Sequence, residues 1–256
     1  MIPFIIGIGA GCDRLFNDFL AIHFVGERGE RISSLINDAL ELQYQIVDFH
    51  RIWSAVRTKY INDTISRWLQ QHSRRSCQVT NLGCGVDTRA FWLDCLSHCS
   101  RYVEVDVVSI NDFKTGELSR ISDLKAPFCP RQVISMDFGA ESVADLPKHG
   151  YDARIPTLWI LEGLVMYLQR SDAIKMITEI ASMSSPGSSV VINYLDSPDK
   201  PDTNPSNLDY MEALLVERGW TGTRECFGEK VINYGLFPKV KQPISTMGFG
   251  TFFKMR

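Results

Sequence analysis

The sequence has little excess charge, no long hydrophobic run and no stretch with the pattern of a secretory signal. Its 256 residues carry a formal net charge of −3 at pH 7, so electrostatics give no reason to expect binding to nucleic acid or to an anionic membrane. The apolar start, residues 1–11, is too short to span a bilayer and lacks the basic stretch of a secretory signal. We therefore expect a protein that contacts neither membranes nor nucleic acids.

Paired cysteines are also missing. The sequence has seven cysteines, an odd number, and no C-x-x-C spacing. Scattered cysteines of this kind favour reduced thiols in a cytosolic setting and predict no zinc site. We interpret most of them as small buried hydrophobic residues, and we expect a cytoplasmic protein without a bound metal that is a monomer or a weak homodimer.

A nucleotide-binding turn is present, but it lacks one glycine of the dinucleotide fingerprint. Residues 78–82 have the character of a short buried strand, which Gly83 and Gly85 break sharply. Two such glycines let the backbone turn tightly and let a ligand come close. Asp87 follows, and the third glycine of G-x-G-x-x-G is replaced by Thr88. Taken alone, this turn is also compatible with a plain strand end.

The second predicted strand, residues 102–106, ends in an acid. Asp106 stands about 20 residues beyond the glycines, where a carboxylate accepts hydrogen bonds from two ribose hydroxyls. A ligand with adenosine and no pyrophosphate needs this carboxylate but not the third glycine. The combination favours S-adenosylmethionine as cofactor over NAD. An NAD-dependent dehydrogenase, the alternative, would also need a Tyr-x-x-x-Lys pair after the fourth predicted strand, and the sequence has none there.

Two further predicted strands end in acids. Residues 132–138 close with Asp137 and Phe138, where an acid can accept a hydrogen bond from the adenine amino group and a ring can meet the base; the alternative for the acid is a helix N-cap. Residues 156–168 form the most apolar run, typical of the centre of a parallel sheet. Glu162 lies at its carboxyl end, where ligands gather in doubly wound folds, and a buried carboxylate there needs a partner.

Helical spacing dominates the chain before the first strand. Apolar residues between positions 12 and 69 predict three or more helices, with breaks around Gly26–Gly29 and near Gln43. Arg57 lies among apolar neighbours on the last of them. Its planar guanidinium can form a bidentate pair with a carboxylate, such as the methionine end of the cofactor. The alternative is an ordinary ion pair with Asp63 or another acid.

The remaining pattern alternates helices with strands. After the turn it predicts helices over residues 87–96, 107–124, 171–184 and 208–218, a fifth strand over 189–195, and a terminal antiparallel pair over 228–237 and 247–255.

Three segments in order resemble a known family. NLGCGVDTR at residues 81–89, VEVD at 103–106 and PTLWILEGLVMYL at 156–168 resemble the leucine carboxyl methyltransferase superfamily, and more closely its bacterial-type S-adenosylmethionine-dependent O-methyltransferase branch. Residues 56–63 are similar to that branch's arginine segment, and residues 15–18 to its N-terminal helix motif.

The resemblance implies an α/β fold of the class I methyltransferase, Rossmann-like type. It implies a doubly wound, mostly parallel seven-stranded sheet, with an N-terminal helical cap at residues 1–75 packed on an S-adenosylmethionine-binding domain at 76–256. Residue by residue, the resemblance implies that Arg57 binds the carboxylate of the cofactor and that Glu162 binds its amino group. It implies that Gly83, with Gly85 and Asp87, lies beside the methionine portion. It also implies that Asp106 binds the ribose and that Asp137 and Phe138 contact the adenine.

The expected reaction is methyl transfer to an oxygen of a small molecule or peptide end. Transfer from a sulfonium needs mainly alignment of the reacting atoms and exclusion of water. No histidine is obviously placed as a general base, so we favour an acceptor carboxylate, which is already ionised. Tyr167 and Tyr194 stand at strand ends and could orient the acceptor oxygen; the alternative for each is a half-buried core residue with its hydroxyl in water. A non-catalytic adenosylmethionine-binding protein, or another use of this cofactor fold, stays open.

Overall fold

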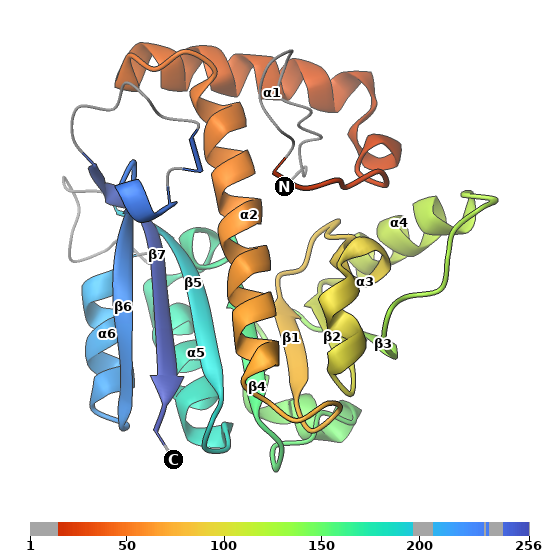
Figure 1. The fold of residues 1–256 in the computed structure, drawn as a ribbon, viewed down its shortest axis with the longest axis vertical. Helices are drawn as coiled ribbons and strands as arrows, with labels where there is room; N and C mark the ends of the chain where they lie inside the picture. Colours follow the sequence, from red (N-terminus) through yellow and green to blue (C-terminus); the bar gives the residue numbers. More distant parts are fainter. Residues whose placement is uncertain (1–14, 197–206, 233, 236–242, 256) are drawn as a thin grey trace.

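A seven-stranded sheet forms the centre of the protein. The computed structural model describes residues 15–196, 207–232, 234–235 and 243–255. The strand order is β3-β2-β1-β4-β5-β7-β6 (Figure 1). The first five strands pair in parallel, and β7 lies antiparallel between β5 and β6. Their bounds are β1 Gln78–Leu82, β2 Tyr102–Asp106, β3 Arg131–Ser135, β4 Thr157–Leu161, β5 Ser189–Leu195, β6 Trp220–Phe227 and β7 Ile244–Lys254.

Helices cover both faces of this sheet. One hydrophobic cluster joins one face to α2, α3, the turn η1 and α4, and a second cluster joins the other face to η2, α5 and α6. In Figure 1, α2 runs in front of the sheet, α5 and α6 lie behind it, and α1 crosses the upper end. Their bounds are α1 Ile22–Tyr44, α2 Phe49–Gln70, α3 Arg89–Trp92, η1 Asp94–His98, α4 Val108–Ser119, η2 Val143–His149, η3 Val165–Tyr167, α5 Arg170–Met183, α6 Leu208–Val216 and η4 Lys230–Ile232.

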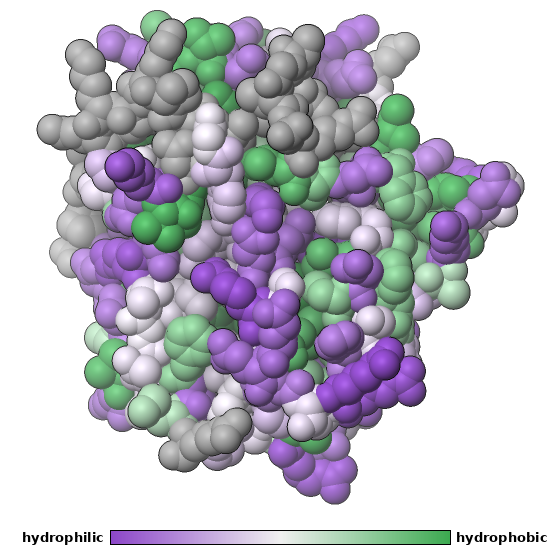
Figure 2. Space-filling model, in the orientation of Figure 1, coloured by the Kyte–Doolittle hydropathy of each residue, from purple (hydrophilic) through white to green (hydrophobic). Residues whose placement is uncertain are grey.

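The two central strands of the sheet, β1 and β4, lie in the interior of the protein. All five residues of β1 and all five of β4 are buried, because helices cover them on both sides. α2 packs directly against this sheet through residues such as Ile61 and Ile65, which are fully buried. Its outward side is polar, and Figure 2 shows hydrophilic side chains along the middle of that face of the molecule. The division of the chain into a cap and a core at residue 75 stays a prediction.

The predicted α/β, mostly parallel seven-stranded sheet is confirmed. The strands at 78–82, 102–106 and 189–195 have the predicted bounds. The third strand ends at Ser135, so that Asp137 and Phe138 lie in the turn after it, and the fourth ends at Leu161. Both runs overshoot because the apolar pattern continues into the following turn.

One expectation is wrong. The partner of the last strand is β6, Trp220–Phe227, and not residues 228–237. This strand lies at the edge of the sheet and is rich in polar residues, so it lacks the apolar signal of a buried strand. Before β1 the described residues form three helical segments, as predicted, because α1 consists of two helices joined across a kink and α2 is the third. The break predicted around Gly26–Gly29 is a kink inside α1, where Gly26 has φ 55° and ψ 170°. None of the described helices is long and apolar enough to cross a membrane.

Candidate functional site

The glycine turn follows β1 directly and forms the floor of a pocket. Gly83 and Gly85 have φ values of +65° and +53°, a left-handed conformation that favours glycine. The N–H groups of Gly83 and Cys84 donate to the carbonyl oxygen of Val105 at 2.8 and 3.1 Å, which ties the turn to β2. A Cβ at position 83 would lie 2.7 Å from Cδ1 of Leu164. The turn therefore needs glycine both for its dihedral angles and for its close packing.

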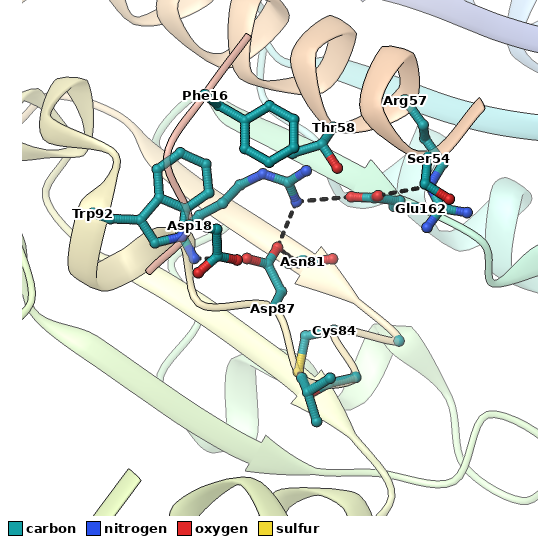
Figure 3. A pocket seen from close by; sticks show the side chains of 14 residues that line it. Phe16, Asp18, Ser54, Arg57, Thr58, Asn81, Cys84, Asp87, Trp92 and Glu162 are labelled. Atoms are coloured by element: carbon teal, nitrogen blue, oxygen red, sulfur yellow. Dashed lines mark hydrogen bonds and ion pairs between the residues drawn. The ribbon is translucent and has the colours of Figure 1, made fainter. Parts of the chain in front are cut away.

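The pocket lies where the strand order reverses between β1 and β4, the usual ligand site of doubly wound folds. It gathers side chains from distant parts of the sequence, which Figure 3 shows from close by. They are Phe16 and Asp18 from the segment before α1, Ser54, Arg57 and Thr58 from α2, Asn81 and Gly83–Asp87 from β1 and its turn, Arg89 and Trp92 from α3, and Glu162 from the end of β4.

A chain of charged groups crosses this pocket. Glu162 Oε1 accepts a hydrogen bond from Arg57 Nε at 2.9 Å, and its Oε2 accepts one from Arg89 Nη1 at 2.7 Å. The same Nη1 lies 2.6 Å from Asp87 Oδ2. Only 4% of the Arg89 side chain is exposed, so these are largely desolvated contacts. Burial by itself raises the pKa of Asp87, but the charges of Arg89 and Lys114 and the hydrogen bonds from Arg89 together hold that pKa below its ordinary value.

Neutral groups hold the charged ones in place. Arg89 Nε donates to Asn62 Oδ1 at 2.7 Å. Asp87 Oδ2 accepts from Asn81 Nδ2 at 2.7 Å and from the Tyr102 hydroxyl at 3.2 Å. Because Asp87, Arg89 and Glu162 each have more than one partner, their side chains are held in place before any ligand enters the pocket.

The segment before α1 is fastened to α3 across the pocket. Asp18 Oδ1 accepts from the hydroxyl of Thr88 at 2.7 Å, and Trp92 Nε1 donates to the same Thr88 hydroxyl at 3.0 Å. The rings of Phe16 and Trp92 stack with centroids 5.9 Å apart. Burial raises the pKa of the Asp18 carboxyl. These contacts close one side of the pocket against solvent.

The structure brings together five of the residues singled out in the sequence. Arg57, Gly83, Gly85, Asp87 and Glu162 all line the pocket. The predicted ion pair of Arg57 with another acid is present, and that acid is Glu162.

Asp63, the other partner considered for Arg57, pairs instead with Lys59 at 2.5 Å. Sequence reasoning missed Asp18, Asn81, Arg89 and Trp92. Arg89 carried a signal, since it follows Asp87 by two positions at the start of a predicted helix.

Asp106 lies beside the turn rather than in the pocket wall. Its Oδ2 accepts from the N–H of Gly85 at 2.7 Å, and its Oδ1 accepts from the N–H of Val107 at 2.8 Å. The carboxylate therefore holds the second glycine of the turn. A contact with ribose stays a prediction.

Asp137 and Phe138 lie farther along the sheet, after β3. Asp137 is exposed, and its Oδ1 accepts from the N–H of Gly139 at 2.9 Å. Phe138 packs against the second hydrophobic cluster. Neither residue lines the pocket, so their contact with adenine also stays a prediction.

The two tyrosines proposed to orient the acceptor do not line this pocket either. Tyr167 is 71% exposed, whereas Tyr194 is fully buried. The Tyr194 hydroxyl lies 3.4 Å from Cys226 Sγ and donates to the carbonyl oxygen of Ser245 at 3.3 Å. Their role in orienting an acceptor stays a prediction.

The pocket suits an adenosylmethionine-type ligand. Groups of both charge signs line its walls, as the amino acid end of such a ligand requires. Within the described ranges, no group of three or more His, Cys, Asp or Glu side chains could hold a metal ion.

Known relatives cover most of this chain. The model of the leucine carboxyl methyltransferase family matches residues 9–181. A Parafrankia protein named as an S-adenosyl-L-methionine-dependent methyltransferase is 30% identical over 180 residues, which cover 70% of this chain and 56% of the relative. A Streptomyces coelicolor protein of the same description is 31% identical over 189 residues, covering 66% of this chain and 61% of the relative. The chain thus spans less than two thirds of the length of these relatives.

Solved structures share the fold. A DUF574 family protein from Streptomyces avermitilis has a TM-score of 0.59 at 12% identity, covering 95% of this chain and 96% of that one. An O-methyltransferase family protein from Burkholderia thailandensis has a TM-score of 0.51 at 12% identity, covering 80% and 59%. The sheet order and these likenesses show the class I methyltransferase fold. With the family match over residues 9–181, they show that the chain belongs to the leucine carboxyl methyltransferase family.

Proposed function

We propose that this chain binds S-adenosyl-L-methionine and transfers its methyl group to an oxygen, with a carboxylate as the expected acceptor. The observation that carries the proposal is the pocket at the glycine turn, in which Arg57 stands 2.9 Å from Glu162 at the carboxyl ends of β1 and β4. Family membership supports the reaction class, and the names of the relatives support the cofactor.

Arg57 is suited to hold the cofactor carboxylate. Within the part of the chain that the structure describes, its guanidinium makes one hydrogen bond, from Nε to Glu162. Its two terminal nitrogens are then available for a bidentate pair with a ligand carboxylate. Glu162 keeps the plane of the guanidinium in one orientation, which lowers the entropic cost of forming that pair.

Asp106 and the residues after β3 would meet the adenosine. Each oxygen of Asp106 already accepts one backbone hydrogen bond, and a carboxylate oxygen has a second lone pair for a ribose hydroxyl. Asp137 and Phe138 follow the neighbouring strand, in the position that an adenine ring would reach beyond the ribose.

The chemistry asks little of the protein beyond positioning. When bound, the cofactor supplies an activated methyl group: an acceptor oxygen forms the new bond to carbon while the electron pair of the breaking carbon–sulfur bond stays on sulfur. A carboxylate acceptor needs no proton removed. The stacked rings of Phe16 and Trp92 and the buried Arg89 network would then serve to align the ligand and exclude water.

Calorimetry with the purified chain tests cofactor binding. We expect binding of S-adenosylmethionine and S-adenosylhomocysteine and no binding of NAD. Arg57→Lys should fail to restore the affinity lost in Arg57→Ala, because an ammonium cannot reproduce the planar fork. Tight NAD binding without a response to either sulfur compound would refute the proposal.

Turnover tests the methyl transfer. Release of S-adenosylhomocysteine should be followed with labelled cofactor and a panel of small carboxylic acids and phenols. We expect methyl esters from a subset of the acids. Cofactor binding with no turnover on any acceptor would favour a non-catalytic adenosylmethionine-binding protein.

A further inference from the structure

The charges that line the pocket do not balance. Its described walls carry two guanidinium groups, Arg57 and Arg89, and three carboxylates, Asp18, Asp87 and Glu162. At neutral pH one negative charge is left without an opposite charge in the pocket.

The unmatched charge lies on Asp18. Both oxygens of Glu162 accept from a guanidinium. Asp87 Oδ1 accepts from the backbone N–H of Arg89, and Asp87 Oδ2 accepts from the Arg89 guanidinium. Asp18 has no cationic partner among the described residues. Its donors are the N–H groups of Leu20 and Ala21, both at 3.1 Å, and the hydroxyl of Thr88.

All three of these groups donate to the same oxygen. They bond to Oδ1 of Asp18, and within the described residues Oδ2 accepts no hydrogen bond. Of the six carboxylate oxygens in the pocket walls, Oδ2 of Asp18 is therefore the one left open. Because Oδ1 is held by three donors, the direction of Oδ2 is fixed as well.

The carboxylate of Asp18 lies toward a second acid rather than a base. Figure 3 shows the carboxylate of Asp18 turned toward Asp87, and repulsion from Asp87 adds to burial in raising the pKa of Asp18. Two carboxylates that face each other in a sheltered pocket repel unless a cation lies near them. The arrangement is thus suited to a positively charged ligand group.

We propose that Asp18 recognises the positive charge of the cofactor, with Oδ2 against its ammonium or its sulfonium. This inference rests on the proposed function. S-adenosylmethionine carries two positive centres and one carboxylate, so its net charge of one complements the unmatched charge of the pocket. Glu162, whose oxygens are both engaged by guanidinium groups, then acts as a positioning residue for Arg57 rather than as the partner of the amino end.

Three ligands separate the two positive centres. S-adenosylmethionine has both, S-adenosylhomocysteine keeps the ammonium alone, and 5′-methylthioadenosine has neither. The variant is Asp18→Asn, which keeps an oxygen for the three donors of Oδ1, removes the charge and replaces Oδ2 by an NH₂ group. We expect about 10- to 100-fold weaker binding of S-adenosylmethionine in calorimetry, the scale of one charge-assisted hydrogen bond. Binding of 5′-methylthioadenosine should stay within about twofold of wild type on the same reasoning, since it offers no charge.

The response of S-adenosylhomocysteine identifies the centre. If Asp18→Asn weakens S-adenosylhomocysteine binding as much as S-adenosylmethionine binding, Asp18 contacts the ammonium. If S-adenosylhomocysteine binding is unchanged, Asp18 contacts the sulfonium. Both results support the proposal. Asp145→Asn, which removes an exposed acid paired with Lys148, serves as the matched control and should leave all three affinities unchanged. Asp18→Ser also accepts a hydrogen bond from backbone N–H groups and should repeat the pattern if the asparagine variant does not fold.

Other outcomes overturn the inference. Equal weakening of all three ligands would mean that Asp18 only supports the pocket structure. Unchanged binding of S-adenosylmethionine with reduced turnover would assign Asp18 to the acceptor side instead. If the wild-type protein binds neither sulfur cofactor, the proposed function itself fails. If the wild type binds both and Asp18→Asn binds them equally well, only the role of Asp18 fails.

Discussion

Glu162→Gln is the perturbation that tests the pocket network most directly. The carboxylate bridges Arg57 Nε at 2.9 Å and Arg89 Nη1 at 2.7 Å. Glutamine has the same shape, but it carries no charge and replaces one acceptor oxygen by an NH₂ donor. One of the two guanidinium groups would then face a donor instead of an acceptor.

The expected loss of stability follows from burial. Removing one partner of a fully buried ion pair costs about 3–5 kcal/mol. Here the side chain of Arg57 is 16% exposed, and Arg89 keeps Asp87 and Asn62 as partners. We therefore expect a smaller decrease in the free energy of unfolding, of about 2–3 kcal/mol. In a chain of this size that corresponds to a Tm lower by about 4–12 °C.

Urea and thermal denaturation of the two proteins measure this difference. The matched control is Glu217→Gln, which removes a 72% exposed carboxylate paired with Arg218 and should change stability by less than about 0.5 kcal/mol. S-adenosylhomocysteine should also bind Glu162→Gln more weakly, because Arg57 loses the group that orients it. If Glu162→Gln is as stable as the control variant and binds normally, the network does not hold the site.

Three further predictions concern the turn and its surroundings. Gly83→Ala should lower the free energy of unfolding by about 1–3 kcal/mol in urea denaturation, because position 83 has a positive φ and no room for a Cβ. The control is Gly116→Ala, which should not lower it, because a Cβ there meets nothing. Equal stability of the two variants would contradict the prediction. Asp106→Ala should weaken S-adenosylhomocysteine binding by about 1–3 kcal/mol in calorimetry through the lost ribose and Gly85 contacts, and unchanged affinity would count against a ribose role. Burial and the charge of Arg57 lower the pKa of His50 to about 4, so its protonation favours the unfolded chain, whose histidine has a pKa of about 6.5. As the pH falls from about 6.5 to about 4, the free energy of unfolding of the wild type should decrease by about 1–2 kcal/mol more than that of His50→Gln, after allowance for partial exposure. If the urea midpoints of the two proteins change equally with pH, the prediction is wrong.

The sequence by itself determined the local elements of the cofactor half. β1, β2 and β5 have their predicted bounds, because each of them ends at or directly before a glycine or an acid, namely Gly83, Asp106 and Asp196. The glycine turn could be predicted for the same reason, since left-handed backbone at positions 83 and 85 selects for glycine alone. These features depend on residues that are adjacent in the sequence, so they can be predicted from the sequence alone.

Tertiary structure decided which charged groups meet. Arg57 could have paired with Asp63, six positions away, yet it bonds to Glu162, which is 105 positions away. Asp18 meets Thr88 across 70 positions, and no pattern in either segment predicts it. A side chain's charge says only that it needs a partner. Which partner it has depends on how the carboxyl ends of β1 and β4, the start of α3 and the middle of α2 come together around one pocket. The edge strand β6 was missed for a related reason, since it is held by pairing with β7 rather than by burial of its own side chains.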